Sequence, residues 1–293
     1  MAMTVRFWGT RGSIPTPGEE TRTYGGNTPC VSLHHDDAVL ICDAGTGIRP
    51  AGIALQEEAP ERDLHLLLSH THWDHIQGFP FFQPLFDPRV RLRLWGADQA
   101  GTRVRDLLSR QMSHEYFPVS FEQLAASIEP HDLGSEPREI GGVVVRHLPQ
   151  PHPGGSSAFR FEAGGRSVVY LTDSELDSLL ADQSLPLRDP DAHRELPSSL
   201  VDFVRGADLL IGDGQYTDAA YPSHQGWGHP RATTTLDLAV EAEVSRLAVF
   251  HHDPTESDAL LEEKIHTVRR RAESRGVTLE VHAAQEGQAV SLT

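Results

Sequence analysis

Short apolar runs, bounded by glycine, proline or aspartate, recur along most of the chain. They are rich in valine, leucine and isoleucine and only a few residues long, which is typical of strands rather than helices. The pattern predicts strands at residues 4–8, 30–34, 38–42, 64–69, 90–95, 143–148, 157–162, 167–172, 207–212, 246–251 and 278–283.

Apolar residues at helical spacing occur in fewer segments. They predict helices at residues 99–112, 120–128, 198–205, 231–243 and 256–275. The last helix follows Thr255 and Ser257, which can cap it, and ends in an arginine-rich turn before Gly276. Strands come first, then some helices, then strands and helices again. This order favours an α+β protein with two sheets and helices outside them over an alternating α/β ladder.

The chain has no clean linker and is expected to form one domain over residues 1–293. Residues 84–140 interrupt the rhythm of strands and are interpreted as an insertion. Tyr116, Phe117 and Pro118 within it either form part of a lid over the site or simply pack the insertion. Residues 174–200 are acidic and contain proline, so they are expected to form a surface excursion.

The composition is acidic, with 25 basic and 42 acidic residues and a formal net charge of −17. Such a surface disfavours tracking of nucleic acid, although metal ions can still create a local site for a small anion. The sequence has no long apolar run and no signal-peptide pattern, so we expect a soluble cytoplasmic protein without a membrane partner. Cys30 and Cys42 lie in predicted strands, as buried thiols or, alternatively, as a disulfide between paired strands.

A cluster of histidines follows the predicted strand 64–69. His70 and His72 are two residues apart, so an extended backbone places both imidazoles on the same side. Asp74 and His75 follow where the chain turns. This combination suits Zn²⁺ or a similar metal ion, whereas the plain alternative is a solvated polar turn.

Histidine or aspartate also ends four other segments. Asp43 and Asp173 each close an apolar strand, where the alternative role is to cap a helix. His152 lies in a Pro/Gly turn, where a histidine is often merely exposed. His251 and His252 are adjacent and face opposite ways, so we expect one of them to be a ligand. Together with the histidine cluster these residues offer enough ligands for two metal ions.

The segment His70-x-His72-x-Asp74-His75 resembles the H-x-H-x-D-H signature of the metallo-β-lactamase-fold hydrolases. Asp43 before it, and His152, Asp173 and His251 after it, follow the order of that superfamily. The resemblance runs from about residue 5 to the end. It implies a four-layer αββα sandwich of two mixed β-sheets flanked by helices.

Within that superfamily the chain resembles the branch of ribonuclease Z and the cyclic-phosphate phosphodiesterases. Residues 9–13 and 24–28 are similar to N-terminal segments of the branch. Gly228-His229 resembles its G-H-[ST]-T element, with Pro230 where serine or threonine is more typical. Residues 250–254 resemble its motif for the last metal ligand.

The resemblance implies a ligand set for two divalent cations, with Zn²⁺ expected and Mn²⁺ as the alternative. In this set one ion is bound by His70, His72 and His152, the other by Asp74, His75 and His251, with Asp173 bridging both. His251 is preferred to His252 because it stands at the strand end. Asp43 is expected to hold a ligand histidine in one tautomer.

The implied reaction is phosphodiester hydrolysis by a hydroxide that bridges the two ions. His229 is expected to donate a proton to the leaving oxygen or to bind a phosphoryl oxygen. Asp213 either orients His229 or is a buried structural residue. Arg11, Asn27 and the turn at Ser13 either contact the phosphate or form a structural turn. Asp74 belongs to the catalytic set through its metal ion.

The expected substrate is a small diester, such as a cyclic nucleotide or another cyclic phosphate. The alternatives are an RNA-processing endonuclease of the ribonuclease Z type, a thioester or lactam hydrolase on the same fold, and a metal-binding sensor without turnover. RNA is disfavoured by the net charge and by the lack of a long basic arm. A homodimer is expected from the resemblance alone.

Overall fold

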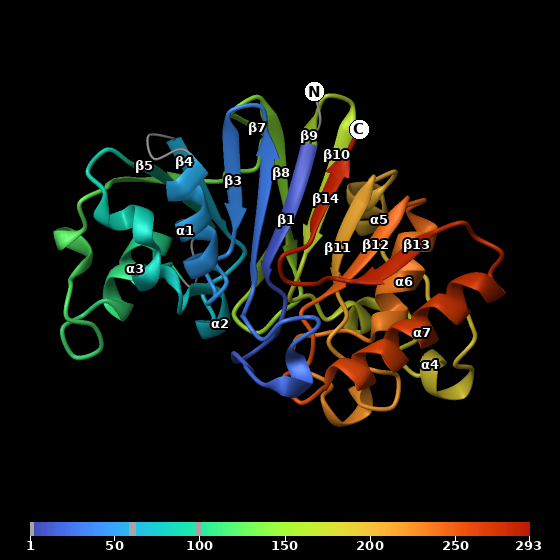
Figure 1. Cartoon of the computed structure of the whole chain (residues 1–293). Coiled ribbons are helices and arrows are strands. Elements are labelled where there is room, and N and C mark those ends of the chain that lie inside the picture. Colours follow the sequence, from blue (N-terminus) through green and yellow to red (C-terminus); the bar gives the residue numbers. More distant parts are fainter. Residues whose placement is uncertain (1–2, 59–62, 98–100) are drawn as a thin grey trace.

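Two sheets of seven strands pack face to face in the computed structural model, which describes residues 3–58, 63–97 and 101–293 (Figure 1). In spatial order the first sheet consists of β14 (Ala289–Leu292), β1 (Met3–Gly9), β2 (Cys30–His35), β3 (Ala38–Cys42), β4 (Asp63–Leu68), β5 (Arg91–Gly96) and β6 (Ser127–Asp132). The second consists of β13 (Glu280–Ala283), β12 (Arg246–Phe250), β11 (Leu209–Asp213), β10 (Arg166–Leu171), β9 (Ser156–Ala163), β8 (Val143–Gln150) and β7 (Arg138–Ile140).

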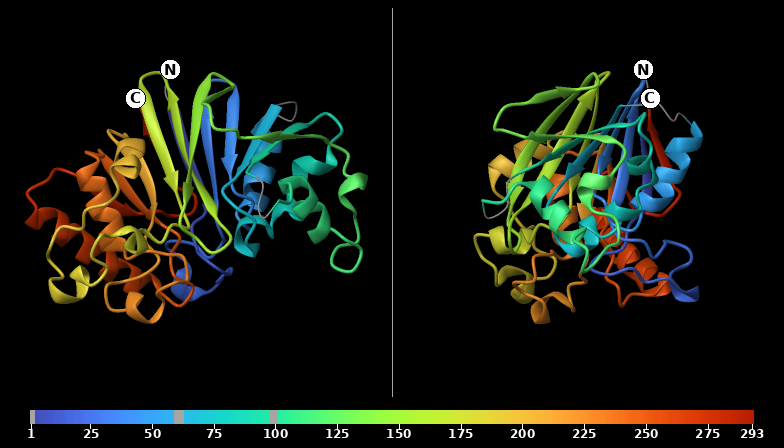
Figure 2. Two further views of the ribbon diagram at one scale, coloured as in Figure 1. Left: turned by 180° about the vertical axis from the view of Figure 1, so that it is seen from behind. Right: turned by 90° about the vertical axis from the view of Figure 1, so that its left-hand side faces the viewer.

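Helices cover the outer faces of both sheets (Figure 2). The α-helices are α1 (Ile48–Glu58), α2 (Trp73–Ile76), α3 (Val104–Gln111), α4 (Leu185–Arg188), α5 (Ser198–Val204), α6 (Ala232–Glu241) and α7 (Asp258–Ser274). Short 3-10 turns are η1 (Glu19–Thr21), η2 (Phe79–Phe81), η3 (Gln83–Phe86), η4 (Phe121–Gln123), η5 (Leu176–Leu179) and η6 (Tyr221–Ser223). None of the helices in the described ranges is both long and apolar enough to cross a membrane.

Three apolar layers hold the elements together. Phe7, Phe161 and Phe250 belong to the layer between the two sheets. A second layer joins the first sheet to α1 and α3, and a third joins the second sheet to α5, α6 and α7. The predicted four-layer αββα sandwich is therefore confirmed.

The parallel parts of the two sheets explain where functional residues gather. Strands β3 to β6 run parallel to one another, and so do β10 to β13. The carboxyl ends of parallel strands meet at one edge of a sheet, and open sheets bind ligands at that edge. In Figure 1 this edge lies below, near α2, whereas both chain termini lie above.

Several local predictions were wrong. The predicted helix 120–128 is instead a turn, η4, followed by β6, because Pro130 and the edge position favour an extended chain. The sequence prediction also omitted α1, whose Pro50 lies in the first turn, where a helix tolerates proline. The short strands β7 and β14 were omitted too. They lie at the outer edges of the sheets, where few apolar residues are needed.

The two irregular segments are tied to the sandwich. Strands β5 and β6 of residues 84–140 extend the first sheet, and only the part between them projects (teal to green in Figure 2). A lid role for this part stays a prediction. The segment 174–200 is not a pure surface excursion, because Arg194 is buried and donates to Thr233 and Thr234 of α6. Cys30 and Cys42 are free, buried thiols.

Candidate metal centre

Four residues at the functional edge have an unusual backbone. Ser13, Asp43, Asp173 and His251 all have positive φ angles, of 64, 62, 49 and 58° respectively. For residues other than glycine this conformation costs about 1–3 kcal/mol and tends to occur at functional sites. Asp43 directly follows β3 and His251 directly follows β12, whereas Asp173 follows β10 after one intervening residue, Thr172. The turn of the chain at these points aims each side chain across the edge of the sandwich.

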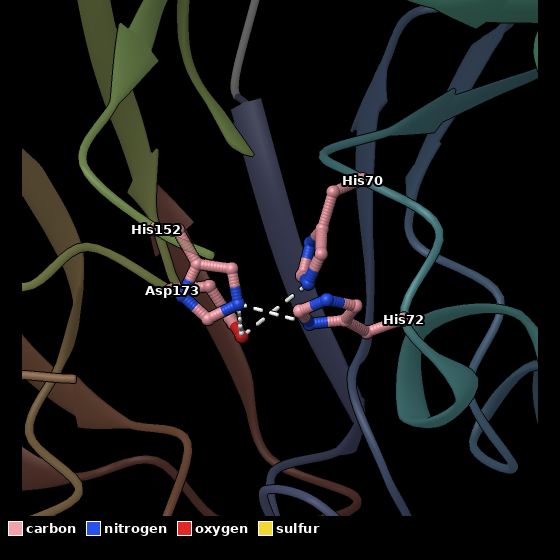
Figure 3. A group of neighbouring side chains, drawn as sticks. All are labelled: His70, His72, His152 and Asp173. Atoms are coloured by element: carbon pink, nitrogen blue, oxygen red, sulfur yellow. Dashed lines mark hydrogen bonds and ion pairs between the residues drawn. The ribbon is translucent and has the colours of Figure 1, made fainter. Parts of the chain in front are cut away.

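One group of side chains joins the end of β4 to the loops after β8 and β10. His70, His72, His152 and Asp173 surround a common point (Figure 3). The Nε2 atom of His152 lies 2.9 Å from Nδ1 of His72 and 3.5 Å from Oδ2 of Asp173. The Nε2 atom of His70 also lies 3.5 Å from Oδ2 of Asp173. Three imidazoles from two distant segments thus converge on one carboxylate.

A second group shares Asp173 with the first. The Nε2 atoms of His75 and His251 are 3.3 Å apart. They lie 3.1 and 3.3 Å from Oδ1 of Asp173, and 3.4 and 3.2 Å from Oδ2 of Asp74. All four residues are buried. The two oxygens of Asp173 therefore face different groups, which is the geometry of a bridging carboxylate.

Hydrogen bonds on the far sides of the rings decide which nitrogens face the two groups. Nδ1 of His75 lies 2.8 Å from the Asp43 carboxylate, and Nδ1 of His152 lies 2.9 Å from the Gly228 carbonyl. Nδ1 of His251 lies 2.8 Å from Oε1 of Gln215. These oxygens only accept, so each Nδ1 donates its hydrogen and each Nε2 presents a lone pair. Metal-binding histidines are commonly oriented in this way.

Asp43 organises this arrangement from behind. Its carboxylate accepts hydrogen bonds from the Ser69 amide and hydroxyl, from Nδ1 of His75 and from the Tyr170 hydroxyl, at 2.7 to 2.8 Å. The Ser69 hydroxyl gives its hydrogen to Asp43 and can therefore accept from Nδ1 of His70, 3.1 Å away. Asp43 is thus the residue behind the ligands that the sequence analysis expected, and it does not cap a helix.

The donor set fits divalent cations. Nε2 of His70 is buried and has no hydrogen-bond partner. In the second group, lone pairs of His75 and His251 face each other and two carboxylate oxygens, which is repulsive unless protons or cations lie between them. Burial alone lowers the pKa of His75, but Asp173, Asp74 and Asp43 outweigh it and raise that pKa well above its usual value. Burial alone raises the pKa of Asp173, but His251 and His75 hold it well below its usual range.

His229 lies beside these groups with its own carboxylate partner. Its Nδ1 lies 2.8 Å from Oδ2 of Asp213, and its Nε2 lies 3.9 Å from Oδ2 of Asp173. Burial alone lowers the pKa of His229, but Asp213 and Asp173 outweigh it and raise the pKa to about 9. Asp213 also accepts a hydrogen bond from the Asp173 amide at 3.0 Å, so its carboxylate holds both His229 and Asp173 in place.

Arg11 and Asn27, both expected to contact phosphate, have structural partners instead. Arg11 is fully buried, and its guanidinium donates to the carbonyls of Gly25, Asp253 and Glu256. The Asn27 side chain donates to Glu286 at 2.9 Å. These bonds tie the N-terminal loop to the C-terminal segments. They hold the Arg11 guanidinium inside the protein, so Arg11 is not the surface residue that the structural alternative expected, and a contact of Arg11 or Asn27 with phosphate stays a prediction.

Ser13 and His252 also have defined positions. The amide of Ser13 donates to Oδ2 of Asp74 at 2.8 Å, so this turn holds a candidate ligand. The buried ring of His252 donates from Nε2 to the Ala284 carbonyl at 2.8 Å, away from the cluster. The position of His251 in the second group agrees with the choice made from the strand end.

The sequence analysis missed Gln215, Tyr170, Ser69 and the Gly228 carbonyl as supports of the ligands. Each stands within four residues of a singled-out histidine or aspartate. Tyr170 is a hydroxyl-bearing residue that follows two valines in a strand buried from Ser167 to Leu171, and this was the one usable signal. The carbonyl of Gly228 carries no signal in the sequence, because any residue has a carbonyl.

The chain is similar to known proteins at both the sequence and the structural level. A family model described as "Beta-lactamase superfamily domain" matches residues 39–252. Ribonuclease Z of Thermoplasma acidophilum is 23% identical, over 90% of this chain and 92% of that protein.

Two solved structures extend the similarity of fold to nearly the whole chain. The metallo-beta-lactamase fold protein YhfI from Bacillus subtilis superposes with a TM-score of 0.69 at 19% identity, covering 99% of both chains. A diphosphatase from the PhnP family has a TM-score of 0.68 at 18% identity, covering 99% of this chain and 98% of that one.

Proposed function

This chain belongs to the beta-lactamase superfamily, a family of metal-dependent hydrolases, and from that premise we propose that it hydrolyses a small phosphodiester such as a cyclic nucleotide or cyclic phosphate. The observation that carries the proposal is the pair formed by His229 and Asp213. The pair touches the shared carboxylate Asp173 but lies outside both ligand groups that Asp173 joins. A proton donor next to a dinuclear site suits an alkoxide leaving group.

The residues proposed to hold the two cations are His70, His72 and His152 for one, Asp74, His75 and His251 for the other, and Asp173 for both. Two divalent cations held by these residues would supply an activated water and would neutralise the charge of a phosphate. A set of imidazoles and carboxylates suits Zn²⁺, with Mn²⁺ as the alternative.

The chain's own residues would handle the proton of the leaving group. As a water oxygen bonds to phosphorus, the ester bond to the leaving oxygen breaks, and that oxygen takes a proton from Nε2 of His229. Nδ1 of His229 keeps its hydrogen and donates it to the Asp213 carboxylate. This hydrogen bond stabilises the positively charged imidazole ring before proton transfer and fixes the orientation of the ring. The water releases its proton to solvent, and Nε2 of His229 takes up a proton from solvent before the next turnover, so the protons balance.

RNA is the second candidate, because the curated relative from Thermoplasma acidophilum is a ribonuclease Z. The net charge of −17 argues against a long polyanion, and Arg11 is occupied inside the protein. A homodimer is retained as an expectation, to be tested by sedimentation.

The test of the reaction class is turnover by protein reconstituted with Zn²⁺ or Mn²⁺. We expect hydrolysis of bis(p-nitrophenyl) phosphate and of a cyclic nucleotide, with no comparable activity on a thioester, nitrocefin or pre-tRNA. Preferred cleavage of pre-tRNA would replace the proposal with the RNA alternative. Metal binding without turnover on the whole panel would indicate a sensor.

Two variants separate the metal ions from the proton donor. We expect Asp173→Ala to lose metal and to abolish turnover, because both groups lose a ligand. We expect His229→Ala to keep about two metal ions per chain and to lose about 10²–10⁴-fold in kcat, the usual contribution of a general acid. Normal metal content and turnover in Asp173→Ala would exclude the two-metal arrangement.

A further inference from the structure

A pocket opens beside the metal centre on the side of His229. It is lined by Ser13, Gln215, Tyr216, Ala220, His224, Trp227, His229, Asp253, Pro254, Thr255 and Glu256, and we call it the Trp227 pocket. Its volume of about 380 Å³ is in the range of small-molecule sites. Because His229 belongs both to its wall and to the surroundings of Asp173, a ligand in the pocket can reach the reacting phosphorus.

One wall of the pocket is aromatic. The rings of Tyr216 and His224 stack at 4.6 Å, and Trp227 meets His224 edge-on at 4.8 Å. Trp227 is 63% exposed, whereas Tyr216 is buried at the base. An exposed indole supported from one side offers its free surface to a flat ring, and stacking of this kind is how proteins hold nucleobases.

Another part of the lining is acidic, and we call it the acidic wall. Asp253 and Glu256 face the pocket, and the residues that line it include neither lysine nor arginine. Lys264 donates to Glu256 at 2.6 Å and offsets its charge, whereas Asp253 accepts from the amide and hydroxyl of Thr255 and pairs with no cation within salt-bridge distance among the described residues. Arg11 donates only to the main-chain carbonyls of Asp253 and Glu256. Carboxylates accept hydrogen bonds from hydroxyl and amino groups and repel phosphate.

We propose that the Trp227 pocket binds the nucleoside part of a mononucleotide substrate, with the base stacked on Trp227 and the free sugar hydroxyl hydrogen-bonded to Asp253, and that the acidic lining of the pocket excludes a second phosphate. This inference rests on the proposed phosphodiester hydrolysis and narrows its substrate. A cyclic nucleotide has one phosphate and a neutral nucleoside, so its base can stack on the aromatic wall and no second phosphate meets the acidic wall. In RNA the leaving strand carries a further phosphate, which would lie against the acidic wall.

The binding test uses adenosine as the probe and needs no turnover. Calorimetry should show that adenosine binds the protein and that ribose binds at least about tenfold more weakly. The Trp227→Ala substitution should lower the affinity for adenosine by about tenfold. Leu187→Ala, which removes another exposed apolar side chain outside the pocket, serves as the matched control and should change binding less than about twofold. Equal binding of adenosine by Trp227→Ala and the unchanged protein would overturn the inference.

The charge test uses adenosine 2′,3′-cyclic phosphate and the same molecule phosphorylated at O5′, as substrates or as competitors of bis(p-nitrophenyl) phosphate. The unchanged protein should prefer the first by about tenfold, and Asp253→Asn should reduce this preference to about threefold. Equal use of both by the unchanged protein would refute the acidic wall. Hydrolysis of bis(p-nitrophenyl) phosphate without adenosine binding would leave the proposed reaction standing and remove only this inference.

Discussion

Individual side chains of the metal centre depend on which ring nitrogen carries the hydrogen. Asp43, Gln215 and the Gly228 carbonyl each accept from Nδ1 of one imidazole and so leave Nε2 of that ring for a cation. Removing such an acceptor allows the other tautomer and lets the ring rotate. The loss of metal affinity is therefore expected at residues that do not touch the metal ion.

The Gln215→Leu substitution tests whether loss of the Nδ1 acceptor lowers metal affinity at His251. We expect about a 10–100-fold loss of metal affinity, because Nδ1 of His251 loses its acceptor at 2.8 Å. Gln215→Glu keeps an acceptor and should retain metal affinity within about tenfold. Competition with a chelator measures both variants. Unchanged affinity in Gln215→Leu would mean that packing alone orients His251.

Gly228→Ala tests the position of His152. An added Cβ would stand 2.2 Å from Nδ1 of His152, so the ring must move, and displacement of about 1 Å can cost about 100-fold in rate. Gly226→Ala is the matched control, since Gly226 also has a positive φ, of 86°, but its Cβ would meet nothing within 4 Å. The two variants share the backbone strain. A similar loss in both would attribute the effect to strain and not to His152.

Among the elements, the loop between β11 and α6 depends on one buried carboxylate from another loop. Glu175 accepts from the Tyr221 hydroxyl at 2.8 Å and from the amides of Gly226 and Gly228 at 2.6 and 3.1 Å. The loop carries Trp227 and His229. Glu175 is thus a positioning residue for both the proton donor and the aromatic wall.

Glu175→Ala should therefore loosen residues 221–228 without removing metal. We expect kcat to fall by up to about 100-fold, with metal content unchanged and faster amide exchange confined to this loop. Glu175→Gln, which keeps one acceptor oxygen, should recover part of the rate. Loss of metal together with global unfolding would indicate a general structural role instead.

The stability of the folded protein should depend on pH through a histidine far from the metal centre. Burial, together with Arg93, lowers the pKa of His65 from 6.5 to about 4. Its Nδ1 accepts from the Trp95 indole at 3.3 Å, and protonation would remove this acceptor. The unfolded chain then binds more protons than the folded protein between pH 6.5 and 4. The contribution of His65 to the free energy of unfolding is therefore fully present above pH 6.5 and is lost as the pH drops towards 4.

His65→Leu should remove this part of the pH dependence. Between pH 7 and 4.5 the unchanged protein should lose about 1–2 kcal/mol more free energy of unfolding than His65→Leu. Urea unfolding at both pH values measures the difference, and comparing the two proteins cancels the titration of groups that they share. Parallel losses in both would show that His65 is not the titrating group.

Local patterns in the sequence predicted many of the strands of the fold. The strands 38–42, 64–69 and 167–172 were predicted almost residue for residue, because a strand buried on both faces is a continuous apolar run. The edge strand β6 and helix α1 were missed, because an edge strand needs little apolar surface and α1 has a proline, Pro50, in its first turn.

The chemistry of the candidate ligands was already present in the sequence, because histidine and aspartate at strand ends are recognisable one segment at a time. What the tertiary structure alone decided is how these segments meet. It placed Gln215 and Gly228 behind the ligands, turned Arg11 inward and set the Trp227 pocket beside His229. These contacts join residues dozens to hundreds of positions apart. Such pairing depends on the packing of two sheets, which no local pattern encodes.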